Sequence, residues 1–437
     1  MNPDFSEMAG VGRGRLDRRI FVDDAIYRLE LEKIFARCWL FLCHESQIPE
    51  PNDYFTTYMG SDPVIVTRKE DGTLGCYLNM CRHRGNRVCR GDQGSARTFV
   101  CPFHGWSYRN DGRLDHVPGH KEVYYGELDI ASHGLVSVAQ IDSYKGLVFA
   151  TFNPQASSLR EYLGDMAWYL DMILDRRSGG VEFTPGTHKW QVKCNWKYPA
   201  DNFVGDTYHG LVSHISAWKA GFEGTPRRKV DYGYEGYQVS PGGGHGLGVL
   251  WTGSREGFIE SALPEMQDYE RQRQQESEER LGDVRAWKMA GIHGTIFPNL
   301  SLLFQAGAIR VWHPLAPNIT EAWSWGFVDK DAPQDFKDTM RKHVTHRHST
   351  SGTWEADDVD NWVQSTNGSY GFLAQQYEQN LQMGLGHETT HPELKGRVGQ
   401  IQCEINQRDF YRQWAELMAA KGPASRPTIP VKCVEAS

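Results

Sequence analysis

Four residues between Cys81 and His104 have the side chains and the spacing to bind iron. They form two arms, Cys81-x-His83 and Cys101-x-x-His104, which are separated by seventeen residues. Each arm offers one thiolate and one imidazole, and each is followed by a glycine that permits a tight turn. Two cysteines and two histidines in paired arms suit a [2Fe–2S] cluster in which one iron is held by Cys₂ and the other by His₂, which is Rieske ligation.

A zinc site is the main alternative for these four residues, because Cys₂His₂ is also a common zinc set. Zinc fingers usually place two cysteines in one arm and two histidines in the other. Here each arm mixes one cysteine with one histidine. The pattern therefore favours the iron–sulfur cluster over zinc, and over an accidental coincidence of unrelated residues.

A second candidate metal site is the pattern D-x-x-H-x-x-x-x-H at Asp206, His209 and His214. Residues five apart diverge on a continuous helix, so the two histidines converge only if the helix ends or turns between them, which Gly210 permits. Two neutral imidazoles plus a carboxylate from elsewhere make the facial triad of a non-haem Fe(II) oxygenase. Histidines in such a segment are more often ordinary hydrogen-bonded residues. The cluster motif favours iron, because O₂ activation requires electrons delivered one at a time.

The elements around the cluster arms are short β-rich stretches with turn dipeptides such as Asp71-Gly72 and Asp111-Gly112. They predict a small all-β domain over residues 38–156 with the arms as loops at its tip. Residues 1–37 and 157–437 are assigned to a second, catalytic domain.

In the catalytic domain, hydrophobic periodicity distinguishes helices from strands. The glycine-rich segment 242–248 is expected to be flexible, and the charge run 271–280 is expected to be a solvated helix face. Strands are predicted at 187–197, 294–305, 308–314 and 321–328, and helices at 24–38, 157–177, 264–290, 332–344 and 407–420, with a mixed, mainly helical segment at 355–382.

Composition limits the classes of protein that fit. The chain has 437 residues, 39% of them hydrophobic, which is enough for two domains with a sizeable core. A net charge of −8 argues against nucleic acid as a partner. No run of eighteen apolar residues and no apolar signal segment is present, so we expect no membrane span and a cytoplasmic location. The nine cysteines show no paired disulfide framework and are expected to be reduced.

The cluster segment 81–104 is locally basic in an acidic chain. This patch is either a set of solvated arginines or a docking surface for an acidic electron donor. It carries one acid, Asp92, against Arg82, Arg84, Arg87, Arg90 and Arg97.

With both metal motifs in place, the chain resembles the large (α) subunit of Rieske aromatic-ring-hydroxylating oxygenases, most like the naphthalene and biphenyl dioxygenase group. Further segments resemble the family in family order: NFVGD at 202–206, GDVRA at 282–286, TIFPN at 295–299 and FYRQW at 410–414. The resemblance implies an α+β fold, with a small all-β Rieske [2Fe–2S] domain inserted in a catalytic domain that has a large antiparallel sheet flanked by helices.

The resemblance also implies roles for individual residues. The third iron ligand is the second aspartate of an aromatic-Glu-x-Asp-Asp motif, which selects Asp358, with Asp357 and Asp360 as near alternatives. Asp206 matches a carboxylate that links a cluster histidine of one subunit to an iron-ligand histidine of its neighbour; a surface or capping aspartate is the alternative. The resemblance further implies that the cluster ligands are Cys81, His83, Cys101 and His104, and that His104 faces Asp206 of another subunit. It implies iron ligation by His209 and His214. It also implies a catalytic role for Asn202 beside Asp206.

The substrate pocket implied by the resemblance is lined by Asn202, Phe203, His293, Leu303 and His348. The two histidines stand where hydrocarbon-degrading members are expected to have less basic or aromatic side chains. Because buried imidazoles need hydrogen-bond partners, this favours a polar aromatic substrate, such as a hydroxy- or carboxy-substituted ring. A histidine that faces away or bonds to the backbone is the alternative.

The implied activity is that of a terminal oxygenase component, which uses O₂ and electrons from an NADH-driven redox chain to cis-dihydroxylate an aromatic ring. An aromatic monohydroxylase, an O-demethylase and a pure electron-transfer Rieske protein are the alternatives. NADH would act through a separate reductase, often with a ferredoxin, in keeping with the absence of a dinucleotide or flavin fingerprint in this sequence. A small β subunit is expected as a separate chain, in an α₃β₃ hexamer or alternatively an α₃ trimer.

Overall fold

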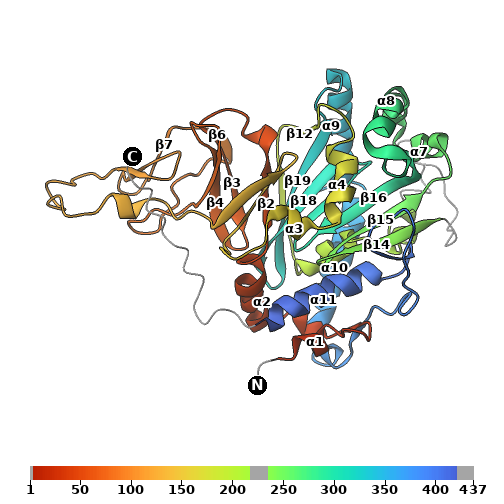
Figure 1. The fold of residues 1–437 in the computed structure, drawn as a ribbon. Coiled ribbons are helices and arrows are strands. Elements are labelled where there is room, and N and C mark those ends of the chain that lie inside the picture. Colours follow the sequence, from red (N-terminus) through yellow and green to blue (C-terminus); the bar gives the residue numbers. More distant parts are fainter. Residues whose placement is uncertain (1–2, 217–234, 421–437) are drawn as a thin grey trace. The chain divides into compact units, whose positions relative to one another are not determined.

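The computed structural model describes residues 3–216 and 235–420 and divides them into two compact units (Figure 1). The smaller unit comprises residues 35–159, and the larger one combines the described residues of 1–34 and 160–420. The smaller unit therefore interrupts the larger one in the sequence. The expected Rieske domain, residues 38–156, falls within the smaller unit.

The smaller unit is built from short antiparallel strands in three sheets. Its core is a cluster of buried residues that includes Trp106, Tyr108 and the two cysteines of the arms. One sheet has the order β5-β4-β3-β6 (Leu74–Leu78, Asp62–Arg68, Asp53–Met59, Gln93–Ser95), the second β7-β8-β9 (Thr98–Val100, Ser107–Arg109, Leu114–His116) and the third β10-β11-β2 (Gln140–Tyr144, Leu147–Thr151, Leu40–His44).

The larger unit is organised around a nine-stranded antiparallel sheet (Figure 1). The strand order among the described residues is β12-β19-β18-β17-β16-β15-β14-β21, and β13 also pairs with β19. The bounds are β12 Val181–Phe183, β13 His188–Val192, β14 Gly236–Gly242, β15 His245–Trp251, β16 Met289–Ile296, β17 Leu300–Leu303, β18 Ala308–Ala316, β19 Ile319–Asp329 and β21 Arg397–Gln400, with a separate pair of β1 Arg15–Leu16 and β20 Gln379–Asn380.

Helices flank this sheet, and two of them, α5 and α10, carry residues of the candidate site. Helix α5 packs on β16 and β17, α11 packs on β14 and β15, α9 packs on β19, and α10 packs on α5. The α+β class with a large antiparallel sheet flanked by helices is thereby confirmed. The helices are α1 Phe5–Met8, α2 Asp24–Glu30, α3 Leu159–Leu163, α4 Met166–Leu174, α5 Lys197–Phe203, α7 Arg255–Ser261, α8 Pro264–Asp283, α9 Gln334–His348, α10 Glu355–Ser369 and α11 Ile405–Ala419.

Two expectations about local structure were wrong in part. The single helix expected over 157–177 is two helices, α3 and α4, because the chain breaks at Gly164, whose φ is +49°. The segment 242–248 is not a flexible loop. Its first glycines form the turn between β14 and β15, and from His245 onward it is a strand whose backbone pairs with both neighbours.

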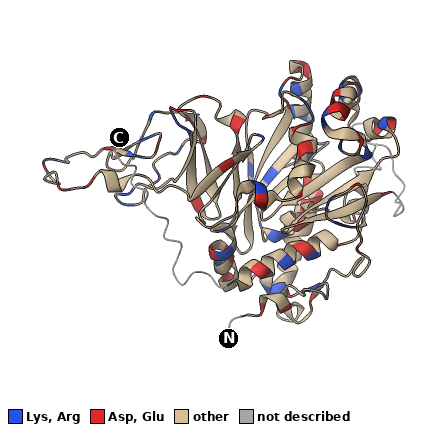
Figure 2. Cartoon of the chain, in the orientation of Figure 1, with Lys and Arg blue, Asp and Glu red and all other residues tan. Residues whose placement is uncertain are grey.

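The charged residues of the run 271–280 on α8 are exposed or half-buried, as expected of a solvated helix face, and acidic and basic residues occur together along the helices of the larger unit (Figure 2). Glu270, one residue before the run, is buried and accepts hydrogen bonds from Arg176 and Arg177, each at 3.0 Å. Within the run, Ser277 is buried and also accepts a hydrogen bond from Arg177. Arg177 further pairs with Asp329 of β19 at 3.2 Å. Charges removed from water need partners, so this network attaches α8 to the sheet.

Replacing Glu270 with alanine should therefore destabilise the protein by about 3–5 kcal/mol, because two buried guanidinium groups would lose their shared carboxylate. Urea unfolding measures the effect. Glu279→Ala, an exposed substitution on the same helix, is the matched control and should leave the unfolding midpoint nearly unchanged. An equal, small effect of both substitutions would contradict the role of Glu270.

Neither membrane crossing nor disulfide bonding is seen in the described residues. Among them, no helix is both long and apolar enough to cross a membrane. Eight cysteines are free and buried, as expected for reduced thiols. Cys433 lies outside the described residues.

Candidate functional site

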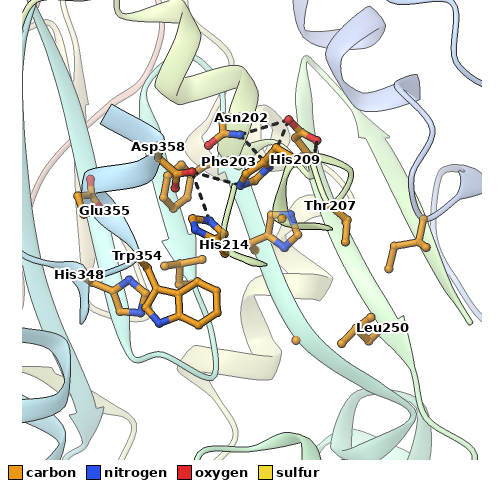
Figure 3. A pocket seen from close by; sticks show the side chains of 16 residues that line it. Asn202, Phe203, Thr207, His209, His214, Leu250, His348, Trp354, Glu355 and Asp358 are labelled. Carbon is orange, nitrogen blue, oxygen red and sulfur yellow. Dashed lines mark hydrogen bonds and ion pairs between the residues drawn. The ribbon is translucent and has the colours of Figure 1, made fainter. Parts of the chain in front are cut away.

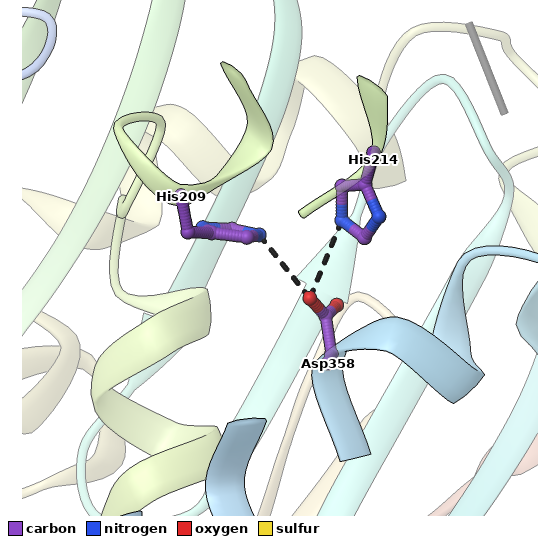
Figure 4. A group of neighbouring side chains, drawn as sticks. All are labelled: His209, His214 and Asp358. Atoms are coloured by element: carbon purple, nitrogen blue, oxygen red, sulfur yellow. Dashed lines mark ion pairs between the residues drawn. The ribbon is translucent and has the colours of Figure 1, made fainter. Parts of the chain in front are cut away.

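Three side chains of the larger unit converge as a possible metal site (Figure 4). The ligand atoms of His209, His214 and Asp358 all lie within 4.8 Å of one another. Oδ1 of Asp358 is 3.4 Å from Nε2 of His209 and 3.3 Å from Nε2 of His214. Two imidazole nitrogens and one carboxylate oxygen around a common point form the donor set of a facial triad, and they are the correct chemistry for Fe(II).

The backbone between the two histidines turns, so that residues five apart can face each other. Helix α5 ends at Phe203, and a short 3₁₀ turn covers His209–Leu211. Before that turn the chain bends at Gly205, whose φ is +141°. A Cβ at this position would lie 2.1 Å from the side-chain oxygen of Gln238, so only glycine fits. Asp358 comes from the first turn of α10, which packs on α5.

The outer nitrogen of each imidazole faces a second acid. Nδ1 of His209 is 3.3 Å from Oδ2 of Asp206 and 3.1 Å from the side-chain amide nitrogen of Asn202. Nδ1 of His214 is 3.6 Å from Oδ2 of Asp357. The carboxylate of Asp206 fixes the orientation of the His209 ring and leaves its Nε2 to face the metal position, whereas Nδ1 of His214 forms no hydrogen bond with a described residue.

The electrostatics favour an ionised carboxylate at the centre. Burial alone would raise the pKa of Asp358, but the facing imidazoles of His209 and His214 outweigh burial and lower the pKa below its ordinary value. The ionised form is the one that binds a metal ion.

The three candidate aspartates of the motif lie in different environments. The carboxylate of Asp358 lies between the two histidines, and that of Asp357 faces the outer side of His214. Asp360 is exposed and accepts a hydrogen bond from Gln364, one turn further along the helix.

A cavity of about 290 Å³ adjoins this centre (Figure 3). The pocket residues expected from the sequence, Asn202, Phe203, His293, Leu303 and His348, all line it. Sequence reasoning did not place the side chains of Leu250, Trp354 and Glu355 there. Trp354 and Glu355 belong to the sequence motif that contains Asp358. Their place in that motif was a signal that could have placed them in the lining of the cavity. Leu250 reaches the cavity through the pairing of β15 with β16, which the local sequence does not encode.

In the smaller unit, the two cluster arms have matching geometry. Cys81 accepts a hydrogen bond at its carbonyl from the backbone nitrogen of Gly85, and Cys101 accepts one from Gly105. Both glycines have positive φ, of +77° and +76°, which a residue with a side chain rarely adopts. The two arms are therefore equivalent turns that each present one cysteine and one histidine.

The side chains of the arms fit a cluster better than a single ion. The rings of His83 and His104 lie 4.5 Å apart, and each has a buried Nδ1 that forms no hydrogen bond with a described residue. The thiols of Cys81 and Cys101 are buried as well. Buried polar nitrogens without partners are expected where a prosthetic group completes their bonding. In the described part of the chain, only His209, His214 and Asp358 lie close enough together for one ion, so the four arm residues do not form a compact zinc site.

Comparisons with known proteins agree with this geometry. Residues 38–140 match the Rieske [2Fe–2S] domain family, and residues 159–420 match the family described as ring hydroxylating alpha subunit (catalytic domain). The chain is 40% identical to the biphenyl dioxygenase subunit alpha of Metapseudomonas furukawaii, over 93% of this chain and 91% of the relative. It is 38% identical to the benzene 1,2-dioxygenase subunit alpha of Pseudomonas putida, over 95% and 93% of the two chains.

Solved structures give the same result. A naphthalene 1,2-dioxygenase variant bound to phenanthrene superposes with a TM-score of 0.89 at 34% identity, covering 96% of both chains. The naphthalene 1,2-dioxygenase of Rhodococcus sp. bound to indole has a TM-score of 0.86 at 36% identity, covering 96% of this chain and 98% of that chain.

A match to the catalytic domain excludes the alternative of a pure electron-transfer Rieske protein. The chain belongs to the ring-hydroxylating alpha subunits, and it is an O₂-incorporating aromatic-ring dioxygenase with a Rieske [2Fe–2S] cluster and a mononuclear iron as its cofactors.

Proposed function

We propose that the chain cis-dihydroxylates an aromatic ring held in the cavity beside His209, His214 and Asp358, and that these three residues hold the mononuclear iron. The observation that carries the proposal is the convergence of two imidazole nitrogens on one carboxylate oxygen in the lining of the cavity. When bound, the iron supplies O₂ activation with electrons received one at a time. The names of the relatives, biphenyl and benzene dioxygenases, support an aromatic substrate.

The residues of the chain position the reactants. Phe203, Leu250 and Leu303 give the cavity apolar walls, against which an aromatic ring can be buried and water excluded. Asp206 and the side-chain amide of Asn202 contact the outer nitrogen of His209. The donor set thus stays aligned beside the bound ring, which is the main contribution that a protein makes to such a reaction.

Product analysis with isotopically labelled O₂ tests this function. The purified chain is supplied with a generic ferredoxin, reductase and NADH, and is offered biphenyl, benzene, naphthalene and a methoxy-substituted benzene. Two labelled oxygen atoms in a cis-dihydrodiol are expected. A product with one labelled atom, or a demethylated product from a methoxy-substituted ring, would contradict dioxygenation.

We also propose that Cys81, His83, Cys101 and His104 hold the cluster, and that Asp206 carries electrons from it to the iron of a neighbouring copy. The imidazole of His209 already contacts Asp206, while the side chain of Asp206 keeps 30% of its surface exposed. An accessible carboxylate can accept a second imidazole N–H, which would link two centres by hydrogen bonds. This arrangement needs at least two copies, in line with an α₃β₃ hexamer or an α₃ trimer, and the relatives' designation as alpha subunits supports a separate small β subunit.

The basic patch of the cluster segment is proposed as the docking surface for an acidic ferredoxin. Arg84, Arg87 and Arg90 are exposed there, and so are the apolar side chains of Val100 and Phe103. An apolar centre with charges around it is typical of a transient protein contact. Complementary charge mainly accelerates encounter and is screened by salt.

Raising the salt concentration should therefore slow reduction of the cluster by its donor roughly tenfold, as measured by stopped-flow absorbance. Arg84→Gln combined with Arg90→Gln should weaken this dependence. Arg113→Gln, which removes an arginine already paired with Asp111 at 2.7 Å, is the control and should retain it. Reduction that is independent of salt in the unmodified chain would count against the patch.

A further inference from the structure

The imidazole of His348 contacts the ring of His343, with centroids 6.4 Å apart, but its nitrogens are not hydrogen-bonded to the described part of the protein. His348 is the last residue of α9, it lines the cavity, and Figure 3 shows its ring directed toward the interior. Its backbone carbonyl accepts a hydrogen bond from Arg310 at 3.2 Å, but its ring forms none with any described residue. A neutral imidazole offers one donor and one acceptor. Both remain available to a molecule in the cavity.

The surroundings keep this ring uncharged. Burial, together with the positive charges of Arg310 and Arg347, lowers the pKa of His348 well below its ordinary value. Arg310 is itself fixed, because its guanidinium pairs with Glu355 at 2.6 Å and lies 4.8 Å from the ring of Phe203. His348 therefore recognises a ligand by hydrogen bonding and not by charge.

The other pocket histidine, His293, also has a ring nitrogen without a partner: its Nε2 is buried and forms no hydrogen bond with a described residue. Burial is the main cause that lowers the pKa of His293, followed by His209, and the backbone groups of Gly291 and Gly205 oppose this only in part.

The charges in the cavity wall distinguish between polar substituents. The lining residues that the structure describes include the acids Asp206, Glu355 and Asp358 but no lysine or arginine. Arg310, one of the two arginines whose charges act on His348, is not among the lining residues and is already paired with Glu355. A carboxylate on the substrate would find no unpaired cationic side chain in the wall, whereas a neutral hydroxyl needs none. A hydroxyl also combines one donor and one acceptor in a single group, as the imidazole does.

We propose that His348 is a specificity residue, which selects an aromatic ring bearing a hydroxyl group over the bare hydrocarbon and over a carboxylate-substituted ring. This inference rests on the proposed function, because it names the substrate class of the same cavity.

The test compares three probes, biphenyl, a hydroxybiphenyl and a biphenyl carboxylate, with the unmodified chain, His348→Phe and His348→Gln. The phenylalanine variant keeps an aromatic ring but removes the hydrogen-bonding atoms, and the glutamine variant keeps a donor and an acceptor. The unmodified chain should bind and oxidise the hydroxybiphenyl best. His348→Phe should lower kcat/KM for the hydroxybiphenyl relative to biphenyl by about 10- to 100-fold, since a buried hydrogen bond is lost, and His348→Gln should restore part of this preference.

Dissociation constants measured without O₂, from quenching of tryptophan fluorescence, should shift in the same direction. A ratio between the two rings that is unchanged in both variants, or a preference of the unmodified chain for the carboxylate, would overturn the inference. Failure of the proposed function is distinguishable. In that case no probe would be oxidised by any variant, while the fluorescence titrations would still report whether binding of the hydroxyl depends on His348.

Discussion

Replacing Asp358 with alanine should empty the mononuclear iron site and abolish ring oxidation, while the cluster of the smaller unit remains intact. Asp358 supplies the oxygen on which both histidines converge, at 3.4 and 3.3 Å, and two neutral imidazoles alone are a poor site for a hard divalent cation. Iron analysis should fall by one iron per chain. The electron paramagnetic resonance signal of the reduced cluster should be unchanged in shape and amount.

The neighbouring aspartates provide matched controls on the same helix. Asp360→Ala removes an exposed carboxylate that bonds only to Gln364 among the described residues, and it should retain iron and activity. Asp357→Asn should cost less than about tenfold in iron affinity or activity, because Oδ2 of Asp357 lies 3.6 Å from Nδ1 of His214, which forms no hydrogen bond with a described residue. Iron loss in Asp360→Ala with retention in Asp358→Ala would reverse the assignment.

The second large effect is expected for Asp206→Asn. Both metal centres should stay filled, because Asp206 lies on the outer side of His209 and is not part of the converging set. Turnover should nevertheless fall by about 100-fold, since the carboxylate is proposed to join the iron centre to the cluster. Single-turnover kinetics separate the two steps: reduction of the cluster by the donor should be normal, and its reoxidation with substrate and O₂ should be slow. Nearly normal reoxidation would exclude a role in electron transfer.

A mixed oligomer tests whether this path crosses between copies. Chains carrying Asp206→Asn keep a working cluster, and chains carrying His104→Ala keep Asp206 and the iron site. Each homogeneous preparation should be nearly inactive. Co-expression of the two should restore a measurable part of the activity, because an intact cluster in one chain can then serve an intact iron centre in the next. A path within one chain would leave the mixture as inactive as its parents.

The sequence predicted the chemistry of the sites better than their surroundings. The cluster arms and the two histidines were predicted from residue type and spacing, whereas Asp358 was implied only by the family resemblance. The need for a turn between His209 and His214 followed from helix geometry alone. The structure places a 3₁₀ turn there, after a bend at Gly205 that no spacing rule indicates. Gly205 is required because Gln238 lies against it, from a strand far along the sequence. Contacts of that kind depend on tertiary packing and are invisible to local patterns.

Two expectations about local structure were wrong in part. The single helix expected over 157–177 is divided at Gly164, which adopts positive φ. The segment 242–248 looked flexible by composition, yet its strand is held by pairing on both sides. For segment 242–248, the pairing of β15 with β16, which is distant in the sequence, decided the local structure.

The central claim is that this chain holds a Rieske cluster and a separate mononuclear iron. The most direct measurement is the content of iron and acid-labile sulfide in the purified chain, beside its content of zinc. The account predicts three irons and two sulfides per chain, which is one [2Fe–2S] cluster plus one iron, with no stoichiometric zinc. Two irons with two sulfides, or zinc in place of iron at either centre, would contradict it.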